Sequence, residues 1–178
     1  MTPPKPDFIL GVDPGLGGAL AIYDNRAPAP AIHCHAVYDM PVIHNKGSKS
    51  FIDPAALAKL VAELAWQHSG LVAAVEKVHS LPRQGGAFNF GLSTGVIHGV
   101  LAAHGVPMTL VSPVKWKTGM GLGRQSPDET SDTNKTRARM VAAKLFPTLA
   151  DSFSRKKDDG RAEALLLAFY YAKLVEPC

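Results

Sequence analysis

Several features that mark special classes of protein are missing from this chain of 178 residues. No apolar run reaches the roughly 18 residues that a membrane-spanning helix needs. The first residues, MTPPKPD, lack the apolar stretch of a signal peptide. No internal repeat is present, and the composition is that of a globular protein, with 46% hydrophobic and 19% charged residues. We therefore expect a soluble intracellular protein with no membrane partner, built as one domain over residues 1–178.

Cysteine is also scarce, and histidine forms no metal-binding pattern. The two cysteines, Cys34 and Cys178, have no metal-ligand spacing, and a pair this far apart is more often two free thiols than a disulfide. The seven histidines include no HExxH motif. His33 and His35 flank Cys34 in an alternating stretch, which favours residues on the faces of a strand. These absences argue against a zinc site and against a disulfide-stabilised scaffold.

Positive charge is concentrated in one segment. Residues 115–161 contain 11 of the 19 Lys and Arg residues but only 6 of the 15 Asp and Glu residues, a net charge of +5. The whole chain carries +4, so the rest of the molecule carries −1. A basic segment on an otherwise balanced body suggests a polyanionic partner such as nucleic acid. The alternative is an ordinary lysine-rich helical surface.

Hydrophobic periodicity predicts an α/β protein with a mixed five-stranded sheet and helices on its faces. Continuous or alternating apolar residues predict strands. After Asp53-Pro54, which can supply the N-cap and first residue of a helix, the apolar residues recur at helical spacing. We expect residues 1–7 to form a flexible leader and the polar run within 122–134 to form a mobile loop. The expected strands are 8–13, 18–24, 32–40, 71–76 and 108–111, and the expected helices are 53–68, 91–104, 135–145 and 160–174.

Two acids end strands that the pattern places in the centre of the sheet. Asp13 closes FILGVD and Glu76 closes LVAAVE. Functional sites in open α/β sheets gather at the carboxyl ends of the strands, and adjacent strands lie about 4.8 Å apart. If these strands are neighbours, the acids can share a divalent cation such as Mg²⁺. Each acid also has a structural alternative, an Asx turn before Pro14 for Asp13 and a solvated strand end for Glu76.

The last helix contributes two further acids. Asp159 and Glu163 are four residues apart and share a helix face, and Glu163 lies in an apolar stretch where an unpaired acid is unfavourable. Asp158 points away from that face, and either Asp158 or Asp159 can serve as the helix N-cap. Together with Asp13 and Glu76, these acids suggest a two-metal site of the kind that hydrolyses phosphodiesters. Glycines 15, 17 and 18 would let a phosphate backbone approach.

Four segments in this order carry a resemblance to a known family. The stretches GVDPGLGGALA, VAAVEKV, SPVKWK and KKDDGRAEALLLA resemble the RuvC-like Holliday junction resolvases of the RNase H-like superfamily, most of all the phage-type and chloroplast branches. The resemblance covers nearly the whole chain, and the last motif is its most specific part. In the close relatives a histidine stands at the position of Asp159, and classical bacterial members have an aspartate at the position of Gly160. The fourth ligand is therefore the point where this chain departs from the family.

The resemblance implies an RNase H-like fold and a crossover junction endodeoxyribonuclease acting in DNA recombination and repair. It implies a homodimer that nicks a four-way junction symmetrically, using a metal-activated water and Mg²⁺, with Mn²⁺ as a substitute and no small-molecule cofactor. A phage-encoded member would act in the host cytoplasm. Helix 91–104 is the candidate dimer element, and the alternative for it is an ordinary core helix. The implied catalytic and metal-binding residues are Asp13, Glu76, Asp159 and Glu163; the expected DNA-binding residues are Arg83, Phe88, Phe90, Lys115, Lys117, Lys135, Arg137 and Arg139. Trp116 is expected mainly to pack.

Three other functions remain open from the sequence. Actin-like ATPases and sugar kinases have a similar sheet and a phosphate turn that residues 13–19 loosely mimic, but they need two such domains. A catalytically weak relative that only binds junctions or other nucleic acid would keep the fold, although four retained acids argue against it. An RNase H-like nuclease acting on RNA–DNA hybrids would use the same site.

Overall fold

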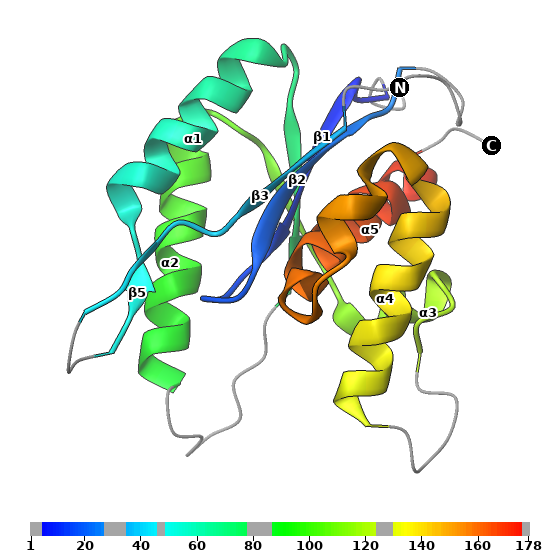
Figure 1. Ribbon diagram of the computed structural model, residues 1–178. Helices are drawn as coiled ribbons and strands as arrows, with labels where there is room; N and C mark the ends of the chain where they lie inside the picture. The colour runs from blue at the N-terminus through cyan, green and yellow to red at the C-terminus, as the bar shows by residue number, and fades with distance from the viewer. Residues whose placement is uncertain (1–4, 27–34, 46–48, 78–86, 124–129, 176–178) are drawn as a thin grey trace.

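The main sheet of the protein runs through the middle of the molecule (Figure 1). The computed structural model describes residues 5–26, 35–45, 49–77, 87–123 and 130–175, with only the backbone for residues 87 and 131. Strand β1 pairs in antiparallel fashion with β2, which pairs in the same way with β3, whereas β6 and β7 run parallel to β1. In spatial order the strands are β3 (Ala36–Asp39), β2 (Ala19–Asp24), β1 (Phe8–Asp13), β6 (Val72–Glu76) and β7 (Met108–Val111).

Helices cover both faces of this sheet (Figure 1). On one face lie α1 (Pro54–Gln67) and α2 (Ala87–Ala103), with a small hairpin of β4 (Val42–Ile43) and β5 (Phe51–Ile52) beside α2. On the other lie α5 (Asp159–Leu174), which packs directly on β1 and β2, and α4 (Ser131–Leu145), which packs on α5. The remaining elements on that side are α3 (Pro113–Gly119) and two 3₁₀ helices, η1 (Pro147–Phe153) and η2 (Lys156–Asp158).

The side chains of β1 explain why the sheet is covered on both faces. Leu10 and Val12 point into the core beneath α1 and α2, whereas Ile9 points into the core beneath α5. All three are fully buried. Successive side chains of a strand point to opposite faces, so an uninterrupted apolar strand needs a covering layer on each side. The expected α/β fold with a mixed five-stranded sheet is confirmed.

The local predictions hold with shifts at the ends of elements. Asp53 caps α1, since its Oδ1 accepts hydrogen bonds of 3.0 Å from the backbone N–H groups of Ala55 and Ala56. Helices α2 and α4 each begin four residues earlier than the periodicity indicates. Leu122, which was expected in a loop, is buried in the core. The β4–β5 hairpin was not foreseen. No helix among the described residues is both long and apolar enough to cross a membrane.

Candidate functional site

The sheet brings two of the predicted acids to one edge. Strands β1 and β6 are parallel neighbours, with Val12 opposite Val75 in the register. The next residue along each strand is an acid, Asp13 on β1 and Glu76 on β6. Their side chains therefore leave the sheet at the same edge, as the strand pattern predicted.

Helix α5 brings the other two acids to this edge because two glycines let it come very close. A Cβ atom at Gly11 of β1 would overlap the backbone oxygen of Ala164, and one at Gly160 would overlap the backbone oxygen of Gly17 in the β1–β2 turn. The start of α5 consequently rests on the backbone of β1 and its turn. Asp159 is the first residue of α5 and Glu163 follows one turn later, so both lie beside Asp13.

The pKa values of Asp13 and Glu76 reflect the charges around them. Burial raises the pKa of Asp13 well above its ordinary value, and the nearby carboxylates of Glu163, Glu76 and Asp159 raise it further, whereas the Lys117 ammonium lowers it. Burial also raises the pKa of Glu76, against the opposing effects of Lys117 and the Trp116 hydrogen bond. Like charges close together in a partly buried place favour protonation or a bound cation.

Helix α3 supplies two groups that hold these acids. Trp116 is fully buried, and its indole N–H donates a hydrogen bond of 2.8 Å to Glu76 Oε2. The next residue, Lys117, places its Nζ 2.8 Å from Glu163 Oε2 and 3.8 Å from Glu76 Oε2. Lys117 thus links the acid of β6 to the acid of α5. Trp116 packs as expected and also fixes the orientation of a predicted catalytic acid.

A second lysine meets the remaining acid from α4. Lys135 Nζ lies 2.6 Å from Asp159 Oδ2. This hydrogen bond raises the pKa of Lys135, which keeps its ammonium charged at neutral pH. Lys117 and Lys135 were both expected to contact DNA, and the structure places each in an ion pair with a predicted catalytic acid. Two ammonium groups therefore balance part of the negative charge at this edge.

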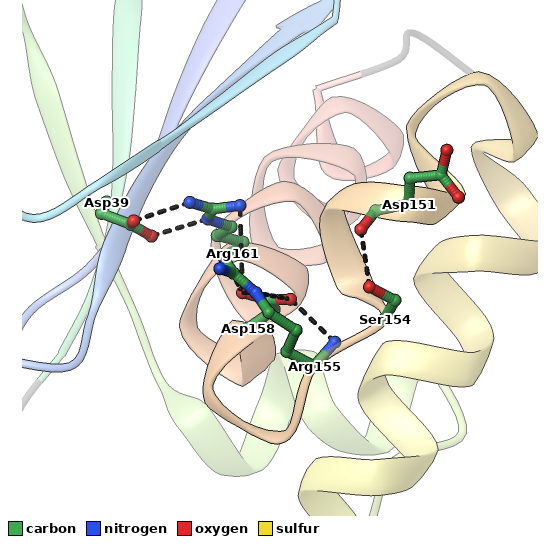
Figure 2. A network of polar contacts seen from close by, with 6 residues as sticks. All are labelled: Asp39, Asp151, Ser154, Arg155, Asp158 and Arg161. Carbon is green, nitrogen blue, oxygen red and sulfur yellow. Dashed lines mark hydrogen bonds and ion pairs between the residues drawn. The ribbon is translucent and has the colours of Figure 1, made fainter.

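A network of arginines fixes the start of α5 (Figure 2). The Arg161 guanidinium forms two hydrogen bonds of 2.6 Å to the two carboxylate oxygens of Asp39 at the end of β3. Behind it, the buried Asp158 accepts hydrogen bonds from the backbone N–H and the guanidinium of Arg155. Figure 2 shows Arg161 between these two acids. Because Arg161 is two residues from both Asp159 and Glu163, this network positions the acids of α5 against the sheet.

The donor set suits a hard divalent cation. Four carboxylates with mutually unfavourable charge supply the oxygen ligands that Mg²⁺ prefers. In the described part of the chain, no three His, Cys, Asp or Glu side chains converge closely enough to hold one ion as they stand. The Lys117 ammonium occupies the contact with Glu163. The carboxylates of this edge are therefore suitable ligands for a divalent metal. A metal held by Glu76 and Glu163 would take the place of the Lys117 ammonium between them.

The other predicted DNA-binding residues lie on α2, α3 and α4 or outside the described residues. Phe88 is exposed in the first turn of α2, and Phe90 is half-buried two residues later. On the opposite layer, the exposed Lys115 lies on α3. Arg137 and Arg139 lie on α4 and form hydrogen bonds with Asn134 and Thr136, respectively. Arg83 lies outside the described residues.

Sequence reasoning missed the groups that hold the acids in place. The spacing gave no sign that Arg161 pairs with Asp39, because these residues are 122 positions apart. The contact of Lys117 with Glu76 and Glu163 was missed as well. The sequence offered one signal for it, because Lys117 directly follows a tryptophan and a buried tryptophan fixes the direction of the next side chain.

Known proteins resemble this chain in structure but not detectably in sequence. No protein-family model matches the chain, and no curated protein matches it by sequence. Solved structures do match. Thermus thermophilus RuvC in complex with a Holliday junction substrate superposes with a TM-score of 0.54 at 15% identity, covering 94% of this chain and 95% of that one. The chain has a RuvC-type fold.

Two further structures extend this fold likeness. The yeast mitochondrial Holliday junction resolvase Ydc2 gives a TM-score of 0.55 at 16% identity, over 97% of this chain and 80% of that chain. Fowlpox virus resolvase, solved with substrate Holliday junction DNA, gives 0.50 at 12% identity, over 96% of this chain and 99% of that chain. The expected resemblance to RuvC-like resolvases is confirmed at the level of fold. At these identities the likeness concerns the backbone, so activity rests on the residues described above.

Proposed function

We propose that this chain is a divalent-metal-dependent endonuclease that resolves four-way DNA junctions by paired symmetric nicks. The observation that carries the proposal is that four carboxylates from β1, β6 and α5, each near a lysine or an indole, lie along one edge of a RuvC-type sheet. The solved structures that share this fold include resolvases bound to Holliday junction DNA.

The proposed chemistry assigns a role to each group at this edge. Asp13, Glu76, Glu163 and Asp159 would hold Mg²⁺, for which Mn²⁺ would substitute. When bound, the metal supplies Lewis-acid stabilisation of the phosphate and a hydroxide-like nucleophile from water. Trp116 keeps the Glu76 carboxylate turned toward the site. Once released from the carboxylates, the ammonium groups of Lys117 and Lys135 can stabilise negative charge that develops on the phosphate.

DNA would approach over the layer of α3 and α4. Lys115 on α3 and Arg137 and Arg139 on α4 lie on the same side of the sheet as α5, which carries two of the acids (Figure 1). Contacts to phosphates fix the position of a protein on DNA without reading sequence. Phe88, which is 81% exposed, would stack on an opened base. Lys115, Arg137 and Arg139 are three of the 11 basic residues in the segment 115–161.

The proposed function includes a homodimer formed through α2. Gly91, Gly95 and Gly99 recur every four residues, so they share one helix face. All three are exposed, and beyond the nearby backbone of α2 itself no described atom lies within 4 Å of a Cβ built on any of them. Leu92, beside them, is 52% exposed. A smooth, exposed and weakly polar helix face suits close contact with the same face of a second copy, as two-fold symmetry requires.

Light scattering during gel filtration tests the dimer. Wild type is expected at about twice the chain mass of 18.9 kDa. Gly95→Leu should give the monomer mass, because the added side chain separates the two helices, whereas Lys59→Leu on the exposed surface of α1 should leave the dimer intact. A monomeric wild type at micromolar concentration would contradict the dimer.

A nicking assay with matched substrates tests the activity. We would compare a synthetic four-way junction, a linear duplex of the same sequence and an RNA–DNA hybrid, each with Mg²⁺, Mn²⁺ or EDTA. Paired nicks on the junction alone, abolished by EDTA, are the expected result. Preferential cleavage of the hybrid would identify an RNase H-like nuclease instead. Junction binding without cleavage in either metal would identify a binding protein and overturn the proposed activity.

A further inference from the structure

Two lysines contact the predicted catalytic acids at positions where a divalent cation would compete with them. Lys117 Nζ lies 2.8 Å from Glu163 Oε2, and Lys135 Nζ lies 2.6 Å from Asp159 Oδ2. Both carboxylates belong to the set that suits a divalent metal. An ammonium and a metal ion held by the same carboxylate repel each other at short range. Each lysine therefore opposes the binding of a metal at this edge.

The charge of Lys117 acts on more than one acid. Besides its contact with α5, its Nζ lies 3.8 Å from Glu76 Oε2, and its charge lowers the pKa of Asp13, which the neighbouring carboxylates raise. The second lysine pairs with the fourth acid. The four carboxylates alone would carry a formal charge of −4 when ionised, and the two ammonium groups reduce it to −2. Removing either ammonium should therefore make the edge more attractive to a cation.

Helix α3 fixes the backbone of Lys117 but leaves the tip of its side chain open to solvent. Trp116, the residue before it, is fully buried, and Gly119 lies so close to α5 that a Cβ there would overlap the ring of Tyr170. The backbone oxygen of Lys117 accepts a hydrogen bond of 2.6 Å from the N–H of Leu122. Its side chain is 31% exposed and carries the ammonium on a flexible four-carbon stem. The ammonium can therefore change partner while the helix stays in place.

Neighbouring acids that only hold the fold are bound by arginine instead. Arg161 donates hydrogen bonds of 2.6 Å to both carboxylate oxygens of Asp39, and Arg155 binds both oxygens of Asp158. Such two-point contacts fix an acid in one orientation. The predicted catalytic acids are met by lysines, whose ammonium is a compact point charge rather than a rigid fork. The acids that suit a metal thus have the partners that are most easily exchanged.

A DNA phosphate offers these ammonium groups another partner, since lysine binds phosphate as a point charge. We propose that Lys117 and Lys135 are exchangeable counter-ions, which pair with the acids in the protein alone and pass to a phosphate of the junction when a metal takes their place. Metal and junction then bind cooperatively, each raising the affinity for the other by the same factor. This inference rests on the proposed function and adds to it how metal binding at the site is regulated by DNA.

The first test measures metal binding without DNA and needs no catalysis. Mn²⁺ would be titrated into the protein, and the unbound ion would be measured from its EPR signal. Lys117→Met, which keeps an unbranched side chain and removes its charge, should bind Mn²⁺ about tenfold more tightly than wild type. Lys135→Met should change the affinity in the same direction. The control Lys144→Met removes an equal charge from an exposed position in the last turn of α4 and should bind Mn²⁺ as wild type does.

The second test measures the coupling between metal and DNA. The affinity for a fluorescein-labelled four-way junction would be measured by anisotropy in EDTA and in saturating Ca²⁺, which also takes oxygen ligands, with a gel to show that the junction stays uncut. Wild type should bind the junction about tenfold more tightly in Ca²⁺ than in EDTA. In Lys117→Met this ratio should be several-fold smaller, because no ammonium passes to the phosphate. A metal that acted only through its own charge would give both proteins the same ratio.

The outcomes separate this inference from the proposed function. If wild type binds Mn²⁺ and nicks junctions, but Lys117→Met and Lys135→Met bind Mn²⁺ no more tightly than Lys144→Met, the exchange is wrong while the nuclease stands. Equal Ca²⁺ ratios for wild type and Lys117→Met would also overturn the exchange. If wild type neither binds Mn²⁺ nor nicks any junction, the proposed function fails, and the inference that rests on it fails with it.

Thermal melting would check that each variant is folded. Should Lys117→Met fail to fold, Lys135→Met decides both tests, because it removes a side chain that is 52% exposed.

Discussion

The two helical layers that cover the sheet are built in opposite ways. On one face, α5 lies directly on β1 with Gly11 and Gly160 at the contacts, and α4 covers it from outside. On the other face, α2 turns Gly95 and its neighbouring glycines outward, where no described atom meets them. The glycines of the first layer hold a helix inside the fold, whereas those of the second leave a helix surface open.

This difference separates the tasks of the molecule. The layer of α5 needs fixed geometry, because its acids must meet Asp13 and Glu76, and the Arg161–Asp39 pair and Lys117 add to that fixation. The layer of α2 instead leaves surfaces open to solvent, a face with three exposed glycines and a hollow at its first turns. Substitutions in the two layers should therefore have opposite consequences.

The largest contrast is expected between two glycine-to-alanine substitutions. Gly11→Ala places a Cβ against the backbone oxygen of Ala164, so we expect a loss of about 3 kcal/mol from overpacking and a fall in Tm of about 6–12 °C. Gly95→Ala places its Cβ in open space within a helix, so we expect a gain of about 0.5–1 kcal/mol. Thermal melting of both variants at low protein concentration makes the comparison. Equal effects at the two positions would contradict the difference between the layers.

The next effect concerns the charge of Asp13. The pKa of this carboxyl is raised in the folded state, so its ionised form is unfavourable there at neutral pH and the effect vanishes below its unfolded pKa of 3.8. Asp13→Asn should therefore raise stability in EDTA by about 0.5–2 kcal/mol at pH 7, the size usual for such substitutions at functional sites.

Denaturant titrations at two pH values would test this charge effect. The stability difference between wild type and Asp13→Asn should shrink as the pH falls toward 4. Saturating Mg²⁺ should stabilise wild type and leave Asp13→Asn unchanged. A less stable Asp13→Asn protein in EDTA would show that Asp13 is held by structural hydrogen bonds rather than crowded by carboxylates.

A smaller effect is expected for the Arg161–Asp39 pair. Asp39 is well exposed, so a double-mutant cycle with Arg161→Ala and Asp39→Ala should give a coupling of about 0.5–1 kcal/mol. Arg161 lowers the pKa of Asp39, so the coupling should be complete at neutral pH and lost as the pH falls below 3.8. The nicking rate of Arg161→Ala should fall more than its stability predicts, because the pair positions Asp159 and Glu163. An unchanged rate would make the pair purely structural.

The strand pattern and the motifs predicted the α/β sheet and the edge at which Asp13 and Glu76 lie. They succeeded because the carboxyl ends of parallel strands lie at one edge of the sheet, so acids that end two such strands lie at that edge as well. The structure adds the partners of those acids. Trp116, Lys117 and Arg161 act across more than 35 residues of sequence, and only the packing of α3 and α5 against the sheet brings them to their acids.

The start of α4 shows a different limit. Its first turn, including Asp132 and Thr133, is polar and reads as loop, yet it is helical because the Thr130 hydroxyl caps the backbone N–H of Thr133. The β4–β5 hairpin was missed for a similar reason, since each strand has only two residues and periodicity needs longer segments.

The most direct measurement of the central claim is single-turnover nicking of a four-way junction by wild type and Glu163→Gln, with Mg²⁺ and with EDTA. If the four carboxylates form one catalytic site, Glu163→Gln should bind the junction as tightly as wild type while its nicking rate falls by about a thousandfold, roughly 4 kcal/mol of lost transition-state stabilisation. EDTA should reduce wild type to the same level. Junction nicking at an undiminished rate by Glu163→Gln would contradict the account, because the edge at which β1, β6 and α5 meet would then not be the active site.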